Sequence, residues 1–281
     1  MIVWVKEFLI FMTVVIFDID GVIRDVGGSY RRALADTVEH FTQGNYRPTP
    51  EEIDRLKSEG IWNNDWEASQ ELIRRYCTAQ KLATQKLEFP SQKTDQNLAP
   101  NPPHYREIVQ FFQSRYRGTD PDDWDGYICA EPLLVERQYF EDLSRSQIKW
   151  GFFSGATRAS AEFVLQQRLG LLNPLLVAME DAPGKPDPTG LWQTLEKLNP
   201  DILEPIIYVG DTVADMYMIN NARQQKPPST FLGVGVLPPH VQKTTESSQA
   251  YAEILKAAGA LLILANVQEL TPDLIQNLSN I

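Results

Sequence analysis

Residues 13 to 21 read TVVIFDIDG. The run begins with apolar and β-branched side chains, and a continuous run of this kind is typical of a strand buried on both faces, as in a parallel sheet. Two carboxylates, Asp18 and Asp20, stand where that strand ends, and Gly21 lets the backbone turn away sharply. Open α/β sheets bind ligands outside the carboxyl ends of their strands. This stretch therefore predicts a parallel sheet and a functional site at its edge.

Apolar runs of the same kind recur along the chain, separated by segments with helical periodicity. This alternation predicts an α/β fold, with a Rossmann-like open parallel sheet and helices on both of its faces. We predict strands at residues 13–17, 148–153, 175–179, 206–210, 231–236 and 261–265, and helices at 135–146, 158–169, 189–198 and 249–258.

Residues 26 to 131 differ because they show helical periodicity and no convincing strand. Ser29 is the expected N-cap of a first helix, and Thr49, followed by proline and two glutamates, predicts a capping box at the start of a second. Apolar stripes predict two further helices, and a stretch at 88–103 rich in Pro, Asn and Gln predicts a long loop. We expect a separate helical domain at 26–131, and an α/β core domain formed by residues 1–25 and 132–281.

Charge and cysteine content narrow the function classes. Asp and Glu outnumber Lys and Arg by 37 to 26, the net charge is −11, and no basic block is present, so nucleic acid is not an expected partner. An acidic protein that handles an anionic substrate needs local positive charge, from a metal or from a few placed Lys, Arg and backbone N–H groups. The isolated Cys77 and Cys129 match no zinc or redox spacing, and we expect a reducing cytoplasmic location.

The first eleven residues, MIVWVKEFLIF, are apolar but do not fit a signal peptide. Lys6 and Glu7 interrupt them and no small-residue cleavage site follows. No run in the chain reaches the roughly 18 apolar residues of a membrane span, so a membrane partner is not expected. We expect these residues to extend the first strand, with Met12 as an alternative start of the native chain.

Two further segments bring polar side chains to positions after predicted strands. FFSGATR at 152–158 places Ser154 and Gly155 at the opening of a helix, whose N–H groups favour an anion; an ordinary helix cap is the alternative. GKPDP at 184–188 holds Lys185 between a glycine and prolines, which limit where its ammonium can point. A rigidly aimed cation suits a phosphoryl oxygen, whereas a surface turn with an incidental lysine is the other interpretation.

GDTVAD at 210–215 follows another predicted strand and carries Asp211 and Asp215. Carboxylate oxygens are hard ligands of the kind that Mg²⁺ prefers, alongside water and substrate phosphate. Acidic residues at a helix N-terminus also complement the helix dipole without any metal. The segment therefore indicates either a magnesium site or a well-formed helix start.

The order FDIDG, FFSGATR, GKPDP, GDTVAD closely resembles the four motifs of the haloacid dehalogenase-like phosphohydrolase superfamily. The resemblance implies that residues 26–131 are the helical cap that this family inserts after its first motif. It also implies a role for each motif residue. Asp18 would be the nucleophile and Asp20 the acid/base, and the phosphate would contact Ser154, Gly155 and Lys185. Mg²⁺ would be held by Asp18, the Asp20 carbonyl and Asp211, with Asp215 as a supporting acid.

The activity that the resemblance implies is a Mg²⁺-dependent phosphomonoesterase acting on a small phosphorylated metabolite. Asp18 would carry an aspartyl-phosphate, Asp20 would protonate the leaving oxygen and then activate water, and Lys185 would stabilise negative charge on the phosphoryl oxygens. Sugar phosphates, phosphoglycolate and amino-alcohol phosphates all fit as substrates. The sequence indicates no particular oligomeric state.

Three other functions of the same fold are alternatives: a dehalogenase, a phosphomutase and a non-catalytic binding protein. Dehalogenases of the superfamily lack the second aspartate of the first motif, and Asp20 is present. Phosphomutases, as the resemblance has it, carry a cap histidine at the place that Tyr30 occupies here. A non-catalytic phosphometabolite-binding protein would bind without turnover. Arg24 and Arg158, each just after a motif, are candidate substrate contacts.

Overall fold

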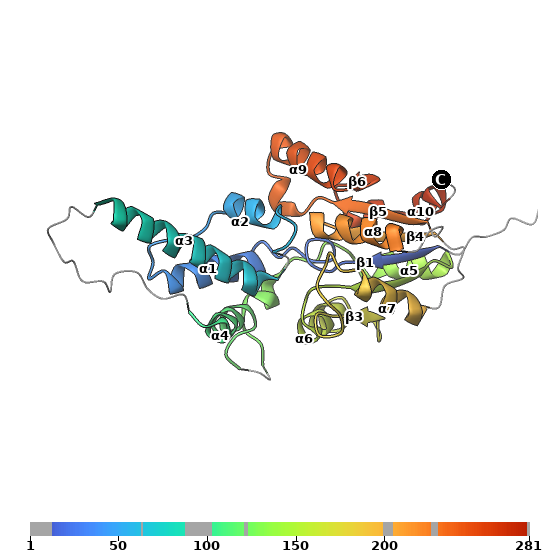
Figure 1. Cartoon of the computed structure of the whole chain (residues 1–281). Coiled ribbons are helices and arrows are strands. Elements are labelled where there is room, and N and C mark those ends of the chain that lie inside the picture. The colour runs from blue at the N-terminus through green and yellow to red at the C-terminus, as the bar shows by residue number, and fades with distance from the viewer. Residues whose placement is uncertain are drawn as a thin grey trace, which may run out of the picture. The chain divides into compact units, whose positions relative to one another are not determined.

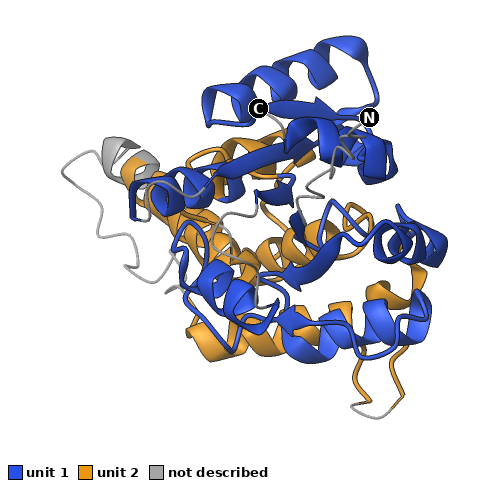
Figure 2. Cartoon of the chain, turned by 90° about the vertical axis from the view of Figure 1, so that its right-hand side faces the viewer, with its two compact units in different colours: residues 1–23, 133–211, 215–281 blue, residues 24–132, 212–214 orange. Residues whose placement is uncertain are grey.

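The computed structural model describes residues 13–62, 64–87, 103–120, 123–198, 205–225 and 230–279. The chain divides into two compact units, coloured separately in Figure 2. Unit 1 comprises Met1–Ile23, Leu133–Asp211 and Asp215–Ile281, and unit 2 comprises Arg24–Pro132 and Thr212–Ala214. The expected extension of the first strand lies outside the described residues, as does nearly all of the expected loop at 88–103.

Unit 1 contains a parallel sheet in which β1 lies at the centre (Figure 1). The strand order is β3-β2-β1-β4-β5-β6. Val14 of β1 pairs with Lys149 on one side and with Ile206 on the other. The predicted α/β fold class is confirmed. The strands are β1 Val14–Phe17, β2 Lys149–Phe153, β3 Leu176–Val177, β4 Ile206–Gly210, β5 Phe231–Val236 and β6 Leu262–Leu264.

Helices and short helical turns connect the strands of this sheet. The predicted helix at 158–169 is α-helical only over its first turn and continues as a π-helical segment, η2. Among the described residues, none of the helices combines the length and the apolar character that a bilayer span requires. The elements are α5 Arg137–Arg145, α6 Arg158–Glu162, η2 Phe163–Arg168, α7 Thr189–Leu198, α8 Val213–Gln225, η3 Pro239–Val241, α9 Thr245–Ala257, η4 Val267–Glu269 and α10 Pro272–Leu278.

Alternate side chains of β1 pack against helices on opposite faces of the sheet, as the two-residue period of a strand requires. Ile16 belongs to a buried cluster with Leu191 of α7 and Ile219 of α8. Phe17 points the other way and meets Phe140 of α5 edge-on, with ring centroids 5.6 Å apart. Because both faces are covered, β1 is buried throughout, which explains its unbroken apolar sequence.

The described residues of unit 2 are mainly helical. Thr49 forms the predicted capping box, in which its side chain accepts from the Glu52 N–H and the Glu52 side chain accepts from the Thr49 N–H. Ser29 is the N-cap residue of α1, as predicted, but its side chain makes no capping hydrogen bond and its hydroxyl donates to the buried Glu131. The cap role of residues 26–131 stays a prediction. The helices are α1 Tyr30–Phe41, α2 Pro50–Lys57, α3 Asp65–Leu87, α4 Tyr105–Tyr116 and η1 Tyr127–Ala130.

Candidate active site

The end of β1 holds Asp18 in a fixed and almost fully buried position. Its backbone N–H donates to the Val209 carbonyl at 2.8 Å, and its Oδ1 accepts from the Ile19 N–H at 2.7 Å. The chain then turns at Gly21, whose φ is +74°. A Cβ at Gly21 would lie 2.0 Å from Asp211 Oδ2, so only glycine allows the first motif to approach the fourth this closely.

The end of β4 places the two carboxylates of the fourth motif. Gly210 ends the strand, and a Cβ there would lie 2.4 Å from the Asp215 carboxyl carbon. Asp215 is fully buried in the first turn of α8. The Asp211 carbonyl accepts a hydrogen bond from the Tyr251 hydroxyl at 3.0 Å. No sequence pattern pointed to Tyr251, because this contact joins positions 40 residues apart and no motif surrounds it.

Lys185 joins the first motif to the fourth. Its Nζ lies 2.7 Å from Asp18 Oδ2 and 2.7 Å from Asp215 Oδ1, and only 4 % of the residue is exposed. The ammonium also lies 5.4 Å from the ring centroid of Phe153 and 5.2 Å from that of Tyr208, within cation–π range. Two carboxylates and two rings therefore hold one cation in place, and the phosphate contact of Lys185 stays a prediction.

The electrostatics show that the site is short of positive charge. Burial raises the pKa of Asp18 to about 6; Lys185 opposes this rise, and the carboxylates Asp215 and Asp20 add to it. Burial alone would lower the pKa of Lys185, but the charges of Asp18 and Asp215 outweigh it and the pKa lies above its ordinary value. Lys185 therefore stays protonated, and a single ammonium does not fully stabilise the ionised form of Asp18.

Three buried carboxylates could hold a cation. One oxygen from each of Asp18, Asp211 and Asp215 lies within 4.8 Å of the others. Three carboxylates face the single ammonium of Lys185, so one divalent cation would restore the charge balance, and oxygen ligands suit Mg²⁺. The donor set thus fits the metal that the resemblance implies. The group of three contains Asp215 in addition to the predicted ligands Asp18 and Asp211. The third predicted ligand, the Asp20 carbonyl, is a backbone group and is not one of these three carboxylates.

The second motif lies at the end of β2. Ser154 is 1 % exposed, and its N–H donates to the Val177 carbonyl at 3.1 Å. Its Oγ accepts from the Ala156 N–H at 3.2 Å, which fixes the turn through Gly155. The phosphate contacts of Ser154 and Gly155 stay predictions.

The two arginines suggested as substrate contacts have protein partners. In unit 2, Arg24 is fully buried and donates to the Tyr116 hydroxyl at 2.6 Å and to Glu131 Oε2 at 2.8 Å. In unit 1, Arg158 forms an ion pair with Asp181. Arg24 therefore stabilises the interior of unit 2 and Arg158 ties α6 to the segment after β3. A substrate contact by either stays a prediction.

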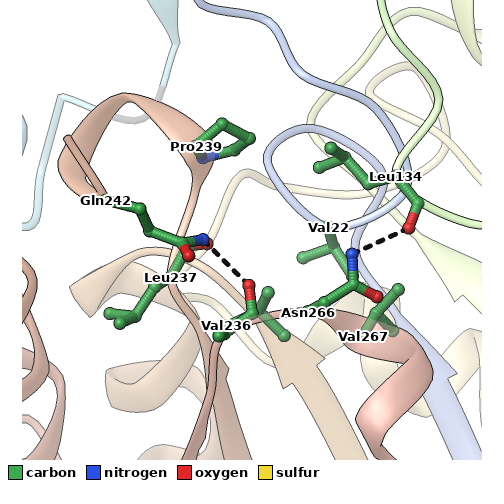
Figure 3. Close-up of a pocket in the computed structure, with 9 residues that line it drawn as sticks. Val22, Leu134, Val236, Leu237, Pro239, Gln242, Asn266 and Val267 are labelled. Atoms are coloured by element: carbon green, nitrogen blue, oxygen red, sulfur yellow. Dashed lines mark hydrogen bonds between the residues drawn. The ribbon is translucent and has the colours of Figure 1, made fainter.

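Unit 1 also contains a cavity of about 310 Å³ beyond the ends of β5 and β6 (Figure 3). Its polar side chains are already bonded: Gln242 donates to the Ala265 carbonyl at 2.8 Å, and Asn266 donates to the Leu134 carbonyl at 3.0 Å. No charged residue and none of the residues assigned to the four motifs lines it. The candidate chemistry therefore lies with the carboxylate and lysine cluster.

An open parallel sheet with buried carboxylates and a lysine gathered after its strands is the architecture of an α/β enzyme. A family model described as haloacid dehalogenase-like hydrolase matches residues 12–223. The chain belongs to this family of hydrolases.

Two solved structures have a similar fold, and one known protein has a similar sequence. A phosphonoacetaldehyde hydrolase-like protein from Oleispira antarctica is 17 % identical, with a TM-score of 0.64 and coverage of 96 % of this chain and 93 % of that one. β-Phosphoglucomutase from Clostridium difficile is 16 % identical, with a TM-score of 0.58 and coverage of 96 % and 97 %. A protein of Phytophthora nicotianae named imidazoleglycerol-phosphate dehydratase is 27 % identical over 254 residues, which are 89 % of this chain. The chain spans about half the length of that relative, 49 %.

Proposed function

We propose that the protein is a Mg²⁺-dependent phosphomonoesterase that forms an aspartyl-phosphate on Asp18. The observation that carries the proposal is the position of the Lys185 ammonium, 2.7 Å from both Asp18 and Asp215, beside the buried Asp211. A nucleophilic carboxylate must meet an anionic phosphate, and such an encounter needs fixed positive charge. The family to which the chain belongs supports the same reaction class.

In the first half-reaction a carboxylate oxygen of Asp18 bonds to phosphorus while the bond from phosphorus to the ester oxygen breaks. Asp20, two residues further along the turn, donates its proton to the departing oxygen. Lys185 stabilises the negative charge that grows on the phosphoryl oxygens. Its contacts with Asp18 and Asp215 hold the ammonium in place before the substrate arrives, so little reorganisation is needed.

In the second half-reaction water attacks the phosphorus of the aspartyl-phosphate. Asp20, now ionised, takes the proton from that water, and the bond between phosphorus and Asp18 breaks to release inorganic phosphate. Ser154 and Gly155 supply hydrogen bonds to the phosphoryl oxygens. Asp18 and Asp20 return to their starting protonation states.

The metal would be held by Asp18 and Asp211, with the Asp20 carbonyl and Asp215 around it. When bound, Mg²⁺ neutralises the repulsion between carboxylate and phosphate. The raised pKa of Asp18 in the metal-free protein supports this part of the proposal, because a cation in addition to Lys185 would favour the ionised form of this nucleophile.

The proposed substrate is a small phosphorylated metabolite, with no nucleic-acid or membrane partner and a cytoplasmic location. The negative charge of the chain and its free cysteines support these assignments. Sugar phosphates, phosphoglycolate and amino-alcohol phosphates belong in a substrate screen. Imidazoleglycerol phosphate belongs there too, because it appears in the name of the relative from Phytophthora nicotianae.

The test is release of inorganic phosphate from an activated ester such as p-nitrophenyl phosphate, with Mg²⁺ and with EDTA. Asp18→Asn should lower the rate by at least about a thousand-fold, because the nucleophile is lost. Asp142→Asn is the matched control, since Asp142 lies on the exposed face of α5 and pairs with Arg145. Equal activity of Asp18→Asn and wild type, or turnover undiminished in EDTA, would refute the proposal.

A phosphomutase is the second candidate, and the similarity to a β-phosphoglucomutase structure favours it. Tyr30 stands where the mutase histidine is expected, and it is buried in unit 2 with its ring centroid 4.0 Å from that of Tyr116. A buried phenol has no ring nitrogen that titrates near neutral pH, so it is poorly suited to relay a proton there. Product analysis separates the two reactions: a mutase returns an isomeric phosphate ester, whereas a phosphatase releases stoichiometric phosphate.

A further inference from the structure

Unit 2 contains a cleft of about 590 Å³ that none of the four motifs lines. Its walls come from α1, the turn after α1, α4 and η1, the helices labelled α1 and α4 in Figure 1. A volume of this size suits a small-molecule ligand. The cleft therefore lies apart in sequence from the carboxylate and lysine cluster of unit 1.

Aromatic rings and cationic side chains lie close together in this cleft. The Arg32 guanidinium lies 4.2 Å from the Tyr127 ring centroid, and that of Arg115 lies 5.0 Å from the Phe111 centroid. His40 is exposed and stacks on Phe111, with centroids 4.0 Å apart and an angle of 9° between the rings. Stacked rings offer a planar surface on which a further aromatic ring can pack.

The carboxylates of the cleft are already engaged. Arg47 lies 2.7 Å from Asp36 Oδ1 and 2.5 Å from Glu39 Oε2. The Tyr127 hydroxyl donates to Asp36 Oδ2 at 2.7 Å. One guanidinium, from Arg47 outside the cleft lining, therefore pairs with both carboxylates and offsets one of their two negative charges.

The two arginines are engaged differently. Among the described residues, Arg32 and Arg115 each contact an aromatic ring, and neither forms an ion pair with a carboxylate. Both guanidiniums act on the same hydroxyl: burial and Asp36 raise the pKa of Tyr127, and the charges of Arg32 and Arg115 oppose that rise. Both cations line this one cleft, in a chain whose net charge is −11. A guanidinium presents its N–H donors in one plane, an arrangement that suits a phosphate group.

We propose that this cleft is a second ligand site that binds an aromatic anion of the nucleoside monophosphate class. The base stacks on the exposed ring of His40, which itself lies on Phe111, and the phosphate accepts hydrogen bonds from Arg32 and Arg115. The inference goes beyond the proposed phosphatase function and does not depend on it, because it uses no residue of the carboxylate and lysine cluster.

The test is calorimetric titration of the intact Asp18→Asn chain with AMP in EDTA. The substitution and the chelator together suppress turnover and metal-assisted binding at the catalytic cluster. AMP should bind at least about ten-fold more tightly than adenosine, which lacks the phosphate, and than inorganic phosphate, which lacks the base. Each of Arg32→Gln, Arg115→Gln and His40→Ala should weaken AMP binding by about ten-fold, since each removes one recognition element.

Arg106→Gln is the matched control, because Arg106 is exposed on the same helix as Arg115 and does not line the cleft. It should leave AMP binding unchanged. The replaced side chains are exposed arginines and an exposed histidine, and circular dichroism of each variant verifies the fold. The proposal is overturned if AMP does not bind in EDTA, if adenosine or phosphate binds as tightly, or if Arg106→Gln weakens binding as much as the cleft variants.

Discussion

Replacing Lys185 with methionine tests the electrostatic account of the site, because it removes the ammonium and keeps a side chain of similar length. Asp18 is 6 % exposed and Asp215 is fully buried, so neither carboxylate can recover the lost contact by turning to bulk water. The substitution leaves two buried carboxylates facing each other without the cation that lay 2.7 Å from both.

Breaking a buried ion pair by removing one partner costs about 3–5 kcal/mol, most of it from the charge left behind. We expect a loss of this order in the free energy of unfolding of metal-free protein at about pH 8, where Asp18 is ionised in the wild type. The loss should shrink at about pH 5. Below the wild-type pKa of about 6 Asp18 is largely protonated, so Lys185 no longer stabilises a full negative charge there.

The direction in which this stability loss changes with pH follows from proton linkage. A carboxyl whose pKa is higher in the folded than in the unfolded state binds more protons when folded, so stability falls as pH rises through that interval. Removing Lys185 raises the pKa of Asp18 further and extends the interval upward in pH. Urea denaturation in EDTA at both pH values measures the difference. A loss that is equal at both, or larger at about pH 5, would refute the reasoning.

Three further outcomes follow from the structure. Gly21→Ala should weaken Mg²⁺ binding measured by calorimetry, because a Cβ would lie 2.0 Å from Asp211 Oδ2 and the positive φ disfavours alanine; unchanged affinity would contradict this. The apparent Mg²⁺ affinity should fall about ten-fold per pH unit below about pH 6, since protons then compete for Asp18; a flat profile would argue against Asp18 as a ligand. Thr49→Ala should destabilise unit 2 by about 1 kcal/mol in hydrogen exchange, by removing the acceptor for the Glu52 N–H, and no change would mean that the capping box is not needed.

The sequence predicted the parallel sheet well because buried strands have little freedom in composition. The runs at 206–210 and 231–236 coincide with β4 and β5, and the helix predicted at 189–198 coincides with α7. The helix predicted at 158–169 is helical over 158–168, but it changes from α-helical to π-helical geometry at Phe163, which an apolar pattern does not specify. Ser29 stands at the N-cap position as predicted, but its hydroxyl makes no capping hydrogen bond and donates to the buried Glu131, a contact 102 residues away in sequence.

The candidate residues of the site could be named from motifs, whereas their contacts with one another could not. The spacing of Asp18 and Asp20 and the rigid segment around Lys185 are local features that a sequence displays. The ion pair between Lys185 and Asp215 joins positions 30 residues apart, and the Tyr251 bond to Asp211 joins positions 40 apart. Such contacts depend on how the sheet brings strand ends together, which local pattern does not specify.

The most direct test of the central claim is identification of a phosphoryl group on Asp18. The protein is mixed with p-nitrophenyl phosphate and Mg²⁺, quenched in acid, digested and analysed by mass spectrometry. We predict one added phosphoryl group, located at Asp18, that is absent in EDTA and in Asp18→Asn. Mg²⁺-dependent turnover with the phosphoryl group on another residue, or with no phosphorylated protein under conditions that trap an acyl-phosphate, would contradict the account.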